Sequence, residues 1–362
     1  MCLRGFVRVK NLDNLTHSLA GAVLGQMGLK KKTGLGMATL IIAANIPDID
    51  AVATLLDGVQ HLAIRRGITH GPIAMLLLPL LLTGIMIGFD RWQGMRGKRP
   101  ADRLPIHKGW LLALAYIGCL SHPALDWLNS YGIRLLEPFS SQWFYGDSIF
   151  IIDIWIWAAL IAGVWISRQR EKKRVGNWQR PAWISFATVC AYIFANGLIT
   201  GKAEAETAKA VEQMIGAAPE LVVANPIPVM FWKRDMLWQM PIAPDSDVPG
   251  ENQYGAGAYS LFNREQPMPD GAIVKSLMIN EIIRYSRDTD KNVDAFLFWS
   301  RLPVIRENVE LESEQGVSMQ FGDMRFLDPI VADRFSVRLV VPWNIFMETA
   351  NERGIKEGSV VE

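Results

Sequence analysis

The chain has 362 residues and a net charge of +1, and half of its residues are hydrophobic. A nearly neutral charge gives no electrostatic reason to expect a nucleic-acid partner. Three cysteines without a CxxC motif argue against a disulfide framework. Because the apolar residues are concentrated before residue 200, the sequence predicts two domains, the first of them in a membrane.

The chain begins with a short basic segment and two short apolar runs. Residues 1–12 contain no long apolar core, so we interpret them as an N-terminal tail rather than a cleavable signal peptide. The runs extend from His17 to Leu29 and from Gly34 to Ile46. As helices they are about 20 Å long, which is short for a bilayer core of about 30 Å. We therefore expect a hairpin of two short helices.

Four longer runs with few or no charged residues predict transmembrane helices. They are His70–Phe89, Gly109–Leu128, Ile149–Ile166 and Pro181–Thr200. The connecting loops 90–108 and 167–180 are rich in Lys and Arg, which places both in the cytoplasm by the positive-inside rule. Residues 13–200 are thus predicted to form an α-helical membrane domain with four long transmembrane helices and the N-terminal hairpin.

The remaining residues, 201–362, predict a soluble α+β domain on the non-cytoplasmic side. We expect helices over residues 202–215 and 272–285. We expect strands over residues 229–232, 295–299 and 335–341, which are rich in β-branched and aromatic residues.

Histidines and aspartates collect at the non-cytoplasmic ends of the predicted helices. The candidates for a metal site are His17, Asp48, Asp50, His70, His122 and Asp126. His122 and Asp126 are four residues apart and share one helix face, although Pro123 predicts a local break there. Such groups suit Zn²⁺, Mn²⁺ or Fe²⁺. Six candidates exceed one tetrahedral site, so either two metals bind or some carboxylates support the ligands or act as general base.

Other interpretations apply to the same residues. Asp48 follows a proline, where an aspartate commonly caps a turn, and a hydrogen bond between His122 and Asp126 could serve only helix packing. Arg65 and Arg66 precede His70. Their guanidinium groups match phosphate oxygens, and an anchor to lipid head groups explains the pair equally well.

Four segments that contain these residues resemble the YdjM-type family of bacterial inner-membrane proteins, described as metal-dependent hydrolases. The segments are Asp13–Gly21, Pro47–Asp50, Arg65–Pro72 and Ser121–Asp126, and the resemblance covers roughly residues 13–200. It implies that the family's His and Asp positions fall on the six candidates above. Phe321–Phe326 is similar to a segment of longer relatives, with less specificity.

Together these observations predict a multi-pass protein of the bacterial inner membrane with a periplasmic second domain and a metal-dependent hydrolase activity. A divalent metal would lower the pKa of a bound water for attack on an ester or phosphoester, and Asp48, Asp50 and Arg66 are the residues expected to carry the reaction. A site at head-group level favours a membrane lipid or a lipid-linked substrate. Two alternatives stay open: a structural metal beside a soluble interaction domain, and an ion-coupled transporter.

Overall fold

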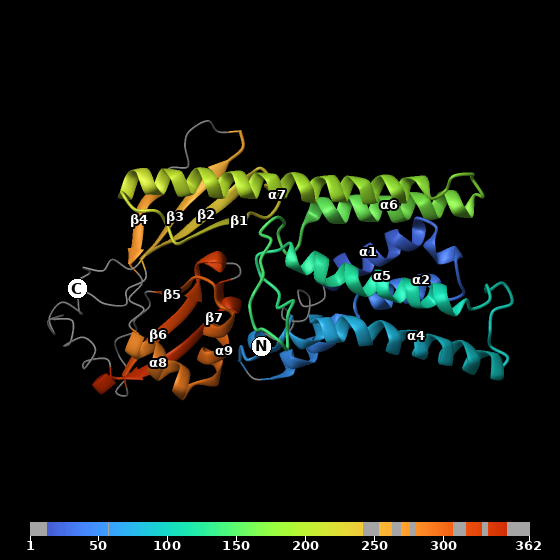
Figure 1. Ribbon diagram of the computed structural model, residues 1–362, viewed down its shortest axis with the longest axis horizontal. Helices are drawn as coiled ribbons and strands as arrows, with labels where there is room; N and C mark the ends of the chain where they lie inside the picture. The colour runs from blue at the N-terminus through green and yellow to red at the C-terminus, as the bar shows by residue number, and fades with distance from the viewer. Residues whose placement is uncertain are drawn as a thin grey trace, which may run out of the picture. The chain divides into compact units, whose positions relative to one another are not determined.

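The computed structural model describes residues 13–56, 58–241, 253–262, 269–275, 280–306, 316–327 and 332–345. The predicted tail, residues 1–12, lies outside the described residues. The chain forms two compact units (Figure 1). The first contains the chain up to Asp50, Arg66–Thr200 and Pro226–Phe231, and the second contains Ala51–Arg65, Gly201–Asn225 and the chain from Trp232 onward.

The first half of the chain is helical. Its helices are α1 (Asp13–Gln26), η1 (Leu29–Lys31), α2 (Gly36–Ala43), η2 (Ile46–Leu55), α3 (His61–Ile64), η3 (Ile68–His70), α4 (Pro72–Met95), α5 (Lys108–Trp127), α6 (Ile154–Lys172) and α7 (Arg180–Ile215). The two predicted short helices correspond to α1 and α2. The predicted break at Pro123 is wrong, because α5 continues through this residue. Packing against α2 and α4 lets α5 tolerate an internal proline, as helices surrounded by other helices often do.

Two helices of the described chain are long and apolar enough to cross a membrane, namely α4 with 24 residues and α7 with 36 residues. The pair formed by α2 and η2 is bent by 46° and would add a third crossing if it forms one broken span. The helices α5 and α6 have 20 and 19 residues but are not apolar enough for the same criterion. The structure therefore shows a helical region with two to three candidate spans, and four spans are not confirmed.

Glycines allow three helices to pack closely near the predicted site. A Cβ atom at Gly21 of α1 would lie 2.7 Å from the carbonyl oxygen of Leu40 in α2, and one at Gly118 of α5 would lie 2.8 Å from the same oxygen. Because small residues let helix backbones approach, α2 lies in close contact with both α1 and α5. This packing brings together the ends of the helices that carry the candidate histidines.

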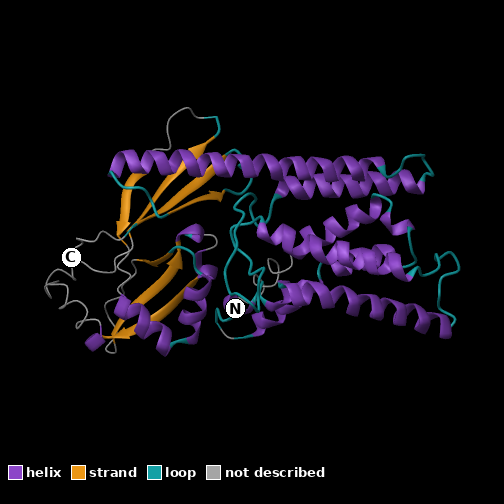
Figure 2. Cartoon of the chain, in the orientation of Figure 1, coloured by secondary structure: helices purple, strands orange, loops and turns teal. Residues whose placement is uncertain are grey.

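The second half of the chain contains two antiparallel sheets (Figure 2). One sheet has the order β1 (Leu221–Pro226), β2 (Lys233–Met240), β3 (Gln253–Ser260) and β4 (Pro269–Lys275). The other has the order β5 (Pro303–Arg306), β6 (Gly316–Asp323) and β7 (Ser336–Pro342). The helices here are α8 (Asn280–Thr289), α9 (Lys291–Trp299), η4 (Met324–Phe326) and η5 (Ala332–Phe335). The strand predicted over residues 335–341 is confirmed by β7.

Three local predictions in this half are wrong. Residues 229–232 form a loop, in which Val229 has a left-handed φ of 69°. Residues 295–299 belong to α9, whose first turn is capped by Asp290. Val293 and Phe296, three residues apart, are both buried, so helical packing overrides strand propensity. The helix expected over 272–285 is strand β4 up to Lys275 and helix α8 from Asn280 onward, and residues 276–279 lie outside the described residues.

Candidate metal centre

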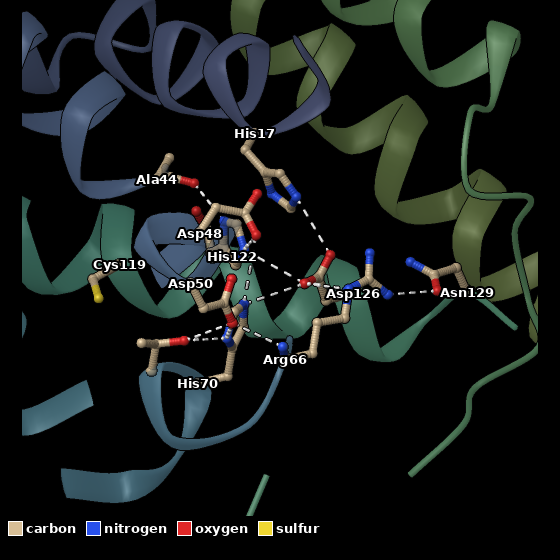
Figure 3. A network of polar contacts seen from close by, with 12 residues as sticks. His17, Ala44, Asp48, Asp50, Arg66, His70, Cys119, His122, Asp126 and Asn129 are labelled. Atoms are coloured by element: carbon tan, nitrogen blue, oxygen red, sulfur yellow. Dashed lines mark hydrogen bonds and ion pairs between the residues drawn. The ribbon is translucent and has the colours of Figure 1, made fainter. Parts of the chain in front are cut away.

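Four of the six candidate residues converge on one point in the first unit (Figure 3). Asp48 comes from η2, His70 from η3, and His122 and Asp126 from α5. One ligand atom from each lies within 4.8 Å of the others. Asp126 Oδ2 is 3.4 Å from His122 Nε2 and 3.5 Å from His70 Nε2. Asp48 Oδ1 is 3.7 Å and 4.0 Å from the same two nitrogens.

These separations are close to those around a metal ion. Ligand atoms at the corners of a tetrahedron lie about 3.3–3.6 Å apart when the bonds to zinc are about 2.0–2.2 Å long. The set supplies two nitrogen and two oxygen atoms, and two carboxylates balance the charge of a divalent cation. The donor set therefore suits zinc, manganese or iron, as the sequence predicts.

Hydrogen bonds fix both imidazoles with Nε2 facing the cluster. His122 Nδ1 donates to the carbonyl oxygen of Ala44 at 2.7 Å. His70 Nδ1 is 2.9 Å from Thr69 Oγ1, which donates its single proton to Asp50 Oδ2 at 2.8 Å. Thr69 must then accept a hydrogen bond from His70 Nδ1. In the neutral form of each ring, Nε2 therefore carries the lone pair, which can bind a cation.

Three of the atoms that face the cluster have no hydrogen bond among the described residues. This holds for Nε2 of His70 and of His122 and for Oδ2 of Asp126. All three side chains are at most 1% exposed, and a buried polar atom without a hydrogen bond costs about 1–3 kcal/mol. A bound cation would remove this cost, so the residues present fit a divalent metal ion.

Asp50 lies behind His70 rather than in the converging group. Its Oδ2 is 3.4 Å from His70 Nδ1 and accepts hydrogen bonds from the backbone of Arg66 and from Thr69, each at 2.8 Å. Carboxylates in this position fix the orientation of a ligating histidine and make it more basic. The structure thus favours a supporting position for Asp50 over the predicted ligand position.

Arg66 forms part of the wall of the site. Its side chain is 2% exposed, and its Nε is 3.1 Å from Asp126 Oδ2, in an ion pair that is not aligned as a hydrogen bond. NH1 donates to Asn129 Oδ1 at 2.9 Å, and the guanidinium lies 4.6 Å from the ring centre of Tyr131. These contacts hold the arginine beside Asp126.

His17 lies against the cluster. Its ring stacks on that of His122 with centroids 3.8 Å apart, and its Nε2 is 3.4 Å from Asp126 Oδ1. The side chain is 2% exposed, and neither ring nitrogen has a hydrogen bond within the part of the chain that the structure describes. His17 therefore faces the oxygen of Asp126 that points away from the other two histidines.

Sequence reasoning missed three supporting groups, namely Thr69, Asn129 and the carbonyl of Ala44. Thr69 precedes His70, and Asn129 follows Asp126 by three residues, so both lie where a residue that orients the site is common. The Ala44 carbonyl has no signal in the sequence, because it depends on how α2 packs against α5.

The fold and the site together define a helical membrane protein with a buried His/Asp cluster that is compatible with a metal ion. A family model described as YdjM inner membrane protein matches residues 12–203, more than half of the chain. The chain therefore belongs to the YdjM inner membrane protein family, as the resemblance in the sequence indicates. No curated protein and no solved structure gives a significant match.

Proposed function

We propose that this protein is a membrane-bound, metal-dependent hydrolase that cleaves an ester or phosphoester in a lipid or lipid-linked substrate at the outer face of the inner membrane. The observation that carries the proposal is the pair of buried imidazoles at His70 and His122. Both direct Nε2 toward two carboxylates, and neither Nε2 has a hydrogen bond among the described residues. Supporting contacts on the far side of each ring are typical of metal sites.

Asp48, His70, His122 and Asp126 would hold the ion, which is Zn²⁺, Mn²⁺ or Fe²⁺ by the nature of the donors. When bound, such an ion acts as a Lewis acid and lowers the pKa of a coordinated water. Asp50 keeps His70 in the tautomer that binds. Asp48 presents Oδ1 to the histidines, which leaves Oδ2 to accept a proton from water.

Arg66 contributes a permanent positive charge in this proposal. Asp48, Asp50 and Asp126 carry three negative charges, and a divalent ion would balance two of them. The guanidinium of Arg66 balances the third. Its contacts with Asp126 and Asn129 make it a residue that positions Asp126. Charge that develops on a phosphoester would be stabilised by the same guanidinium through its proximity to the site.

The orientation in the membrane follows from the two basic loops. The loop after α4 and the loop after α6 are both rich in Lys and Arg, which supports a cytoplasmic position for both. The cluster lies near the C-terminal end of α5, at the other end of that helix from its basic loop. This supports a multi-pass protein with its site at the outer face, and with residues 201–362 in the periplasm.

A structural metal is the second candidate, and a specific observation favours it. All four converging residues are at most 8% exposed, and structural metal sites are closed by four protein ligands whereas catalytic ones keep an open position. The two candidates differ in what happens when one ligand is removed. A structural site loses stability, and a catalytic site loses activity in a protein that is still folded.

The first experiment is the metal content of the detergent-purified protein, measured by elemental mass spectrometry. We expect near-stoichiometric Zn, Mn or Fe in the wild type and its loss in Asp48→Asn and His122→Ala. His107→Asn is the matched control, because His107 is exposed and only caps α5. A wild type that takes up no metal after reconstitution contradicts the proposal.

The second experiment measures hydrolysis of a soluble phosphodiester and of a fluorescent phospholipid by the metal-loaded protein, beside its thermal unfolding. Lost activity in Asp48→Asn with an unchanged midpoint supports catalysis. A metal that is bound without any hydrolysis, and whose removal lowers the midpoint strongly, supports the structural candidate.

A further inference from the structure

The helix that carries two of the candidate carboxylates has its apolar side chains on the outside. Asp48 and Asp50 of η2 are 8% and 9% exposed, whereas Ile49, Val52 and Leu55 are 60%, 65% and 83% exposed. Water-soluble proteins show the opposite arrangement, because charged groups lose hydration when buried and apolar groups gain by burial. The surface of η2 is therefore not suited to contact with water.

The exposed residues of η2 form one continuous stripe. In a 3-10 helix, side chains at positions i and i+3 lie directly above one another. Ile49, Val52 and Leu55 follow this spacing and so occupy one face of η2. Every exposed residue from 42 to 56 is aliphatic, so no charge on this stretch offers an ion pair to a protein partner.

The segment that follows the site also exposes apolar side chains. Ile68 in η3 is 64% exposed, and Ile73 in the first turn of α4 is 44% exposed. Further along α4, exposed leucines occur at Leu76, Leu77, Leu80 and Leu81. Because α4 is a candidate membrane span in a member of an inner-membrane family, the occupant of its exposed face is lipid. The pair of α2 and η2 passes the same length and hydropathy criterion as one bent span, so lipid is the occupant of the exposed face of η2 as well.

We infer that η2 lies within the bilayer and that Ile49, Val52 and Leu55 contact acyl chains. The bend of 46° between α2 and η2 is what a broken or re-entrant segment requires. Backbone outside a regular α-helix is tolerated at membrane depth where protein buries it. Here Pro47, Asp48 and Asp50 form the buried side of the helix.

This location identifies the class of molecule that reaches the site. The carboxylates lie on the buried side of η2 and the lipid-contacting stripe on its exposed side. An acyl-chain amphiphile in the outer leaflet would therefore be separated from the cluster only by this short helix. The assignment of such an amphiphile as substrate rests on the proposed hydrolase function. The lipid contact of η2 does not, because it rests on the exposure and spacing of its side chains and on the candidate spans.

The experiment places a nitroxide spin label at each of the three positions in full-length protein. The variants are Ile49→Cys, Val52→Cys and Leu55→Cys in a background of Cys2→Ser, Cys119→Ala and Cys190→Ser. The protein is reconstituted in nanodiscs of phosphatidylcholine and phosphatidylglycerol. Power-saturation electron paramagnetic resonance then measures the accessibility of each label to oxygen, which partitions into lipid, and to a nickel chelate, which stays in water.

Two controls calibrate the scale. Leu81→Cys on the exposed face of α4 reports lipid, and Lys98→Cys on the exposed basic loop reports water. We expect the ratio of oxygen to nickel accessibility at all three η2 positions to match that of Leu81→Cys and to exceed that of Lys98→Cys several-fold. A ratio like that of Lys98→Cys overturns the inference. Low accessibility to both reagents also overturns it, because a protein partner or a second copy then covers η2.

Metal content measured on the same samples separates the two proposals. Labels in lipid with no metal bound would leave the lipid contact of η2 intact and contradict the hydrolase. Labels in water with a stoichiometric metal would contradict the lipid contact and leave the metal centre intact.

Discussion

Each unit of the structure buries a carboxylate beside an arginine, and the hydrogen bonding of these two sites differs. In the second unit, Asp323 is fully buried and its two oxygens are surrounded by donors. Arg325 supplies its backbone N–H and Nε to Oδ1 at 2.9 and 2.8 Å and NH2 to Oδ2 at 2.8 Å. Ser300 Oγ and the backbone N–H of Arg301 also donate to Oδ2, at 2.6 and 2.8 Å.

In the first unit, by contrast, the hydrogen bonding of the cluster around Asp126 is incomplete. Arg66 approaches Asp126 Oδ2 without an aligned hydrogen bond, and Nε2 of His70 and His122 have none among the described residues. A site whose polar atoms are all satisfied stabilises the fold, whereas buried nitrogen and oxygen atoms without hydrogen bonds are compatible with a bound cation. The two sites are equally buried, and their hydrogen bonds distinguish a fully paired ion pair from a cluster that is compatible with a metal ion.

The largest expected effect is in the second unit. Arg325→Met should destabilise it by about 3–5 kcal/mol, because the Asp323 carboxylate would stay buried without its counter-charge. Denaturant unfolding followed by tryptophan fluorescence measures the loss. Arg338→Met, on the exposed face of β7, is the matched control and should change stability by less than about 0.5 kcal/mol. Equal effects of the two substitutions would contradict a structural role for Asp323.

Acid should weaken the same unit. Burial alone would raise the pKa of Asp323, but the adjacent Arg325 guanidinium and the hydrogen bonds lower the pKa to about 2. Because the folded-state pKa lies below the unfolded value of about 3.9, the stabilisation is complete above pH 4 and is lost as the pH falls through about 2. The loss amounts to about 2–3 kcal/mol. Asp323→Asn should abolish this pH dependence in acid unfolding curves.

Removing the support of His70 should weaken metal binding without abolishing it. Asp50→Asn is expected to lower metal affinity by about 10- to 100-fold, or about 1.4–2.7 kcal/mol, measured by competition with a chelator. Asp90→Asn is the control, because Asp90 is equally buried but pairs with Arg99 and Arg103 instead. Complete loss of the metal in Asp50→Asn would make Asp50 a ligand, as the sequence predicts.

The smallest expected effect concerns the hydroxyl between these residues. Thr69→Val removes the group that accepts from His70 Nδ1 and donates to Asp50, and should lower metal affinity by about tenfold or less. Thr39→Val provides the comparison, since Thr39 is also buried but bonds only to the carbonyl of Leu35 in α2. Identical chelator titrations for the two variants would exclude Thr69 from the support of the site.

Several features of the fold follow from local sequence. Long apolar runs predict α4 and α7 because twenty uncharged residues have no other favourable environment, and the alternation after Phe335 predicts β7. The errors at 229–232 and 295–299 share one cause, whereas at 272–275 a strand formed where a helix was expected. β-branched and aromatic residues favour strands only weakly, and the outcome was decided by the cap at Asp290 and by the prolines before Val229.

The candidate site was predicted in its residues but not in its arrangement. Identity and order of the His and Asp residues single out six positions, and the four-residue spacing of His122 and Asp126 places both on one helix face. The sequence could not distinguish ligands from supporting groups, because Asp48 and Asp50 are only two residues apart and look equivalent.

The sequence by itself determined which chemical groups are available and which segments are apolar, since both are properties of neighbouring residues. Only the tertiary structure decided that Asp48 faces the histidines while Asp50 lies behind His70, and that Ile49, Val52 and Leu55 point outward. The physical reason is that these choices depend on close packing of α1, α2 and α5 around Gly21 and Gly118, and on carbonyl and hydroxyl groups that come from distant parts of the chain.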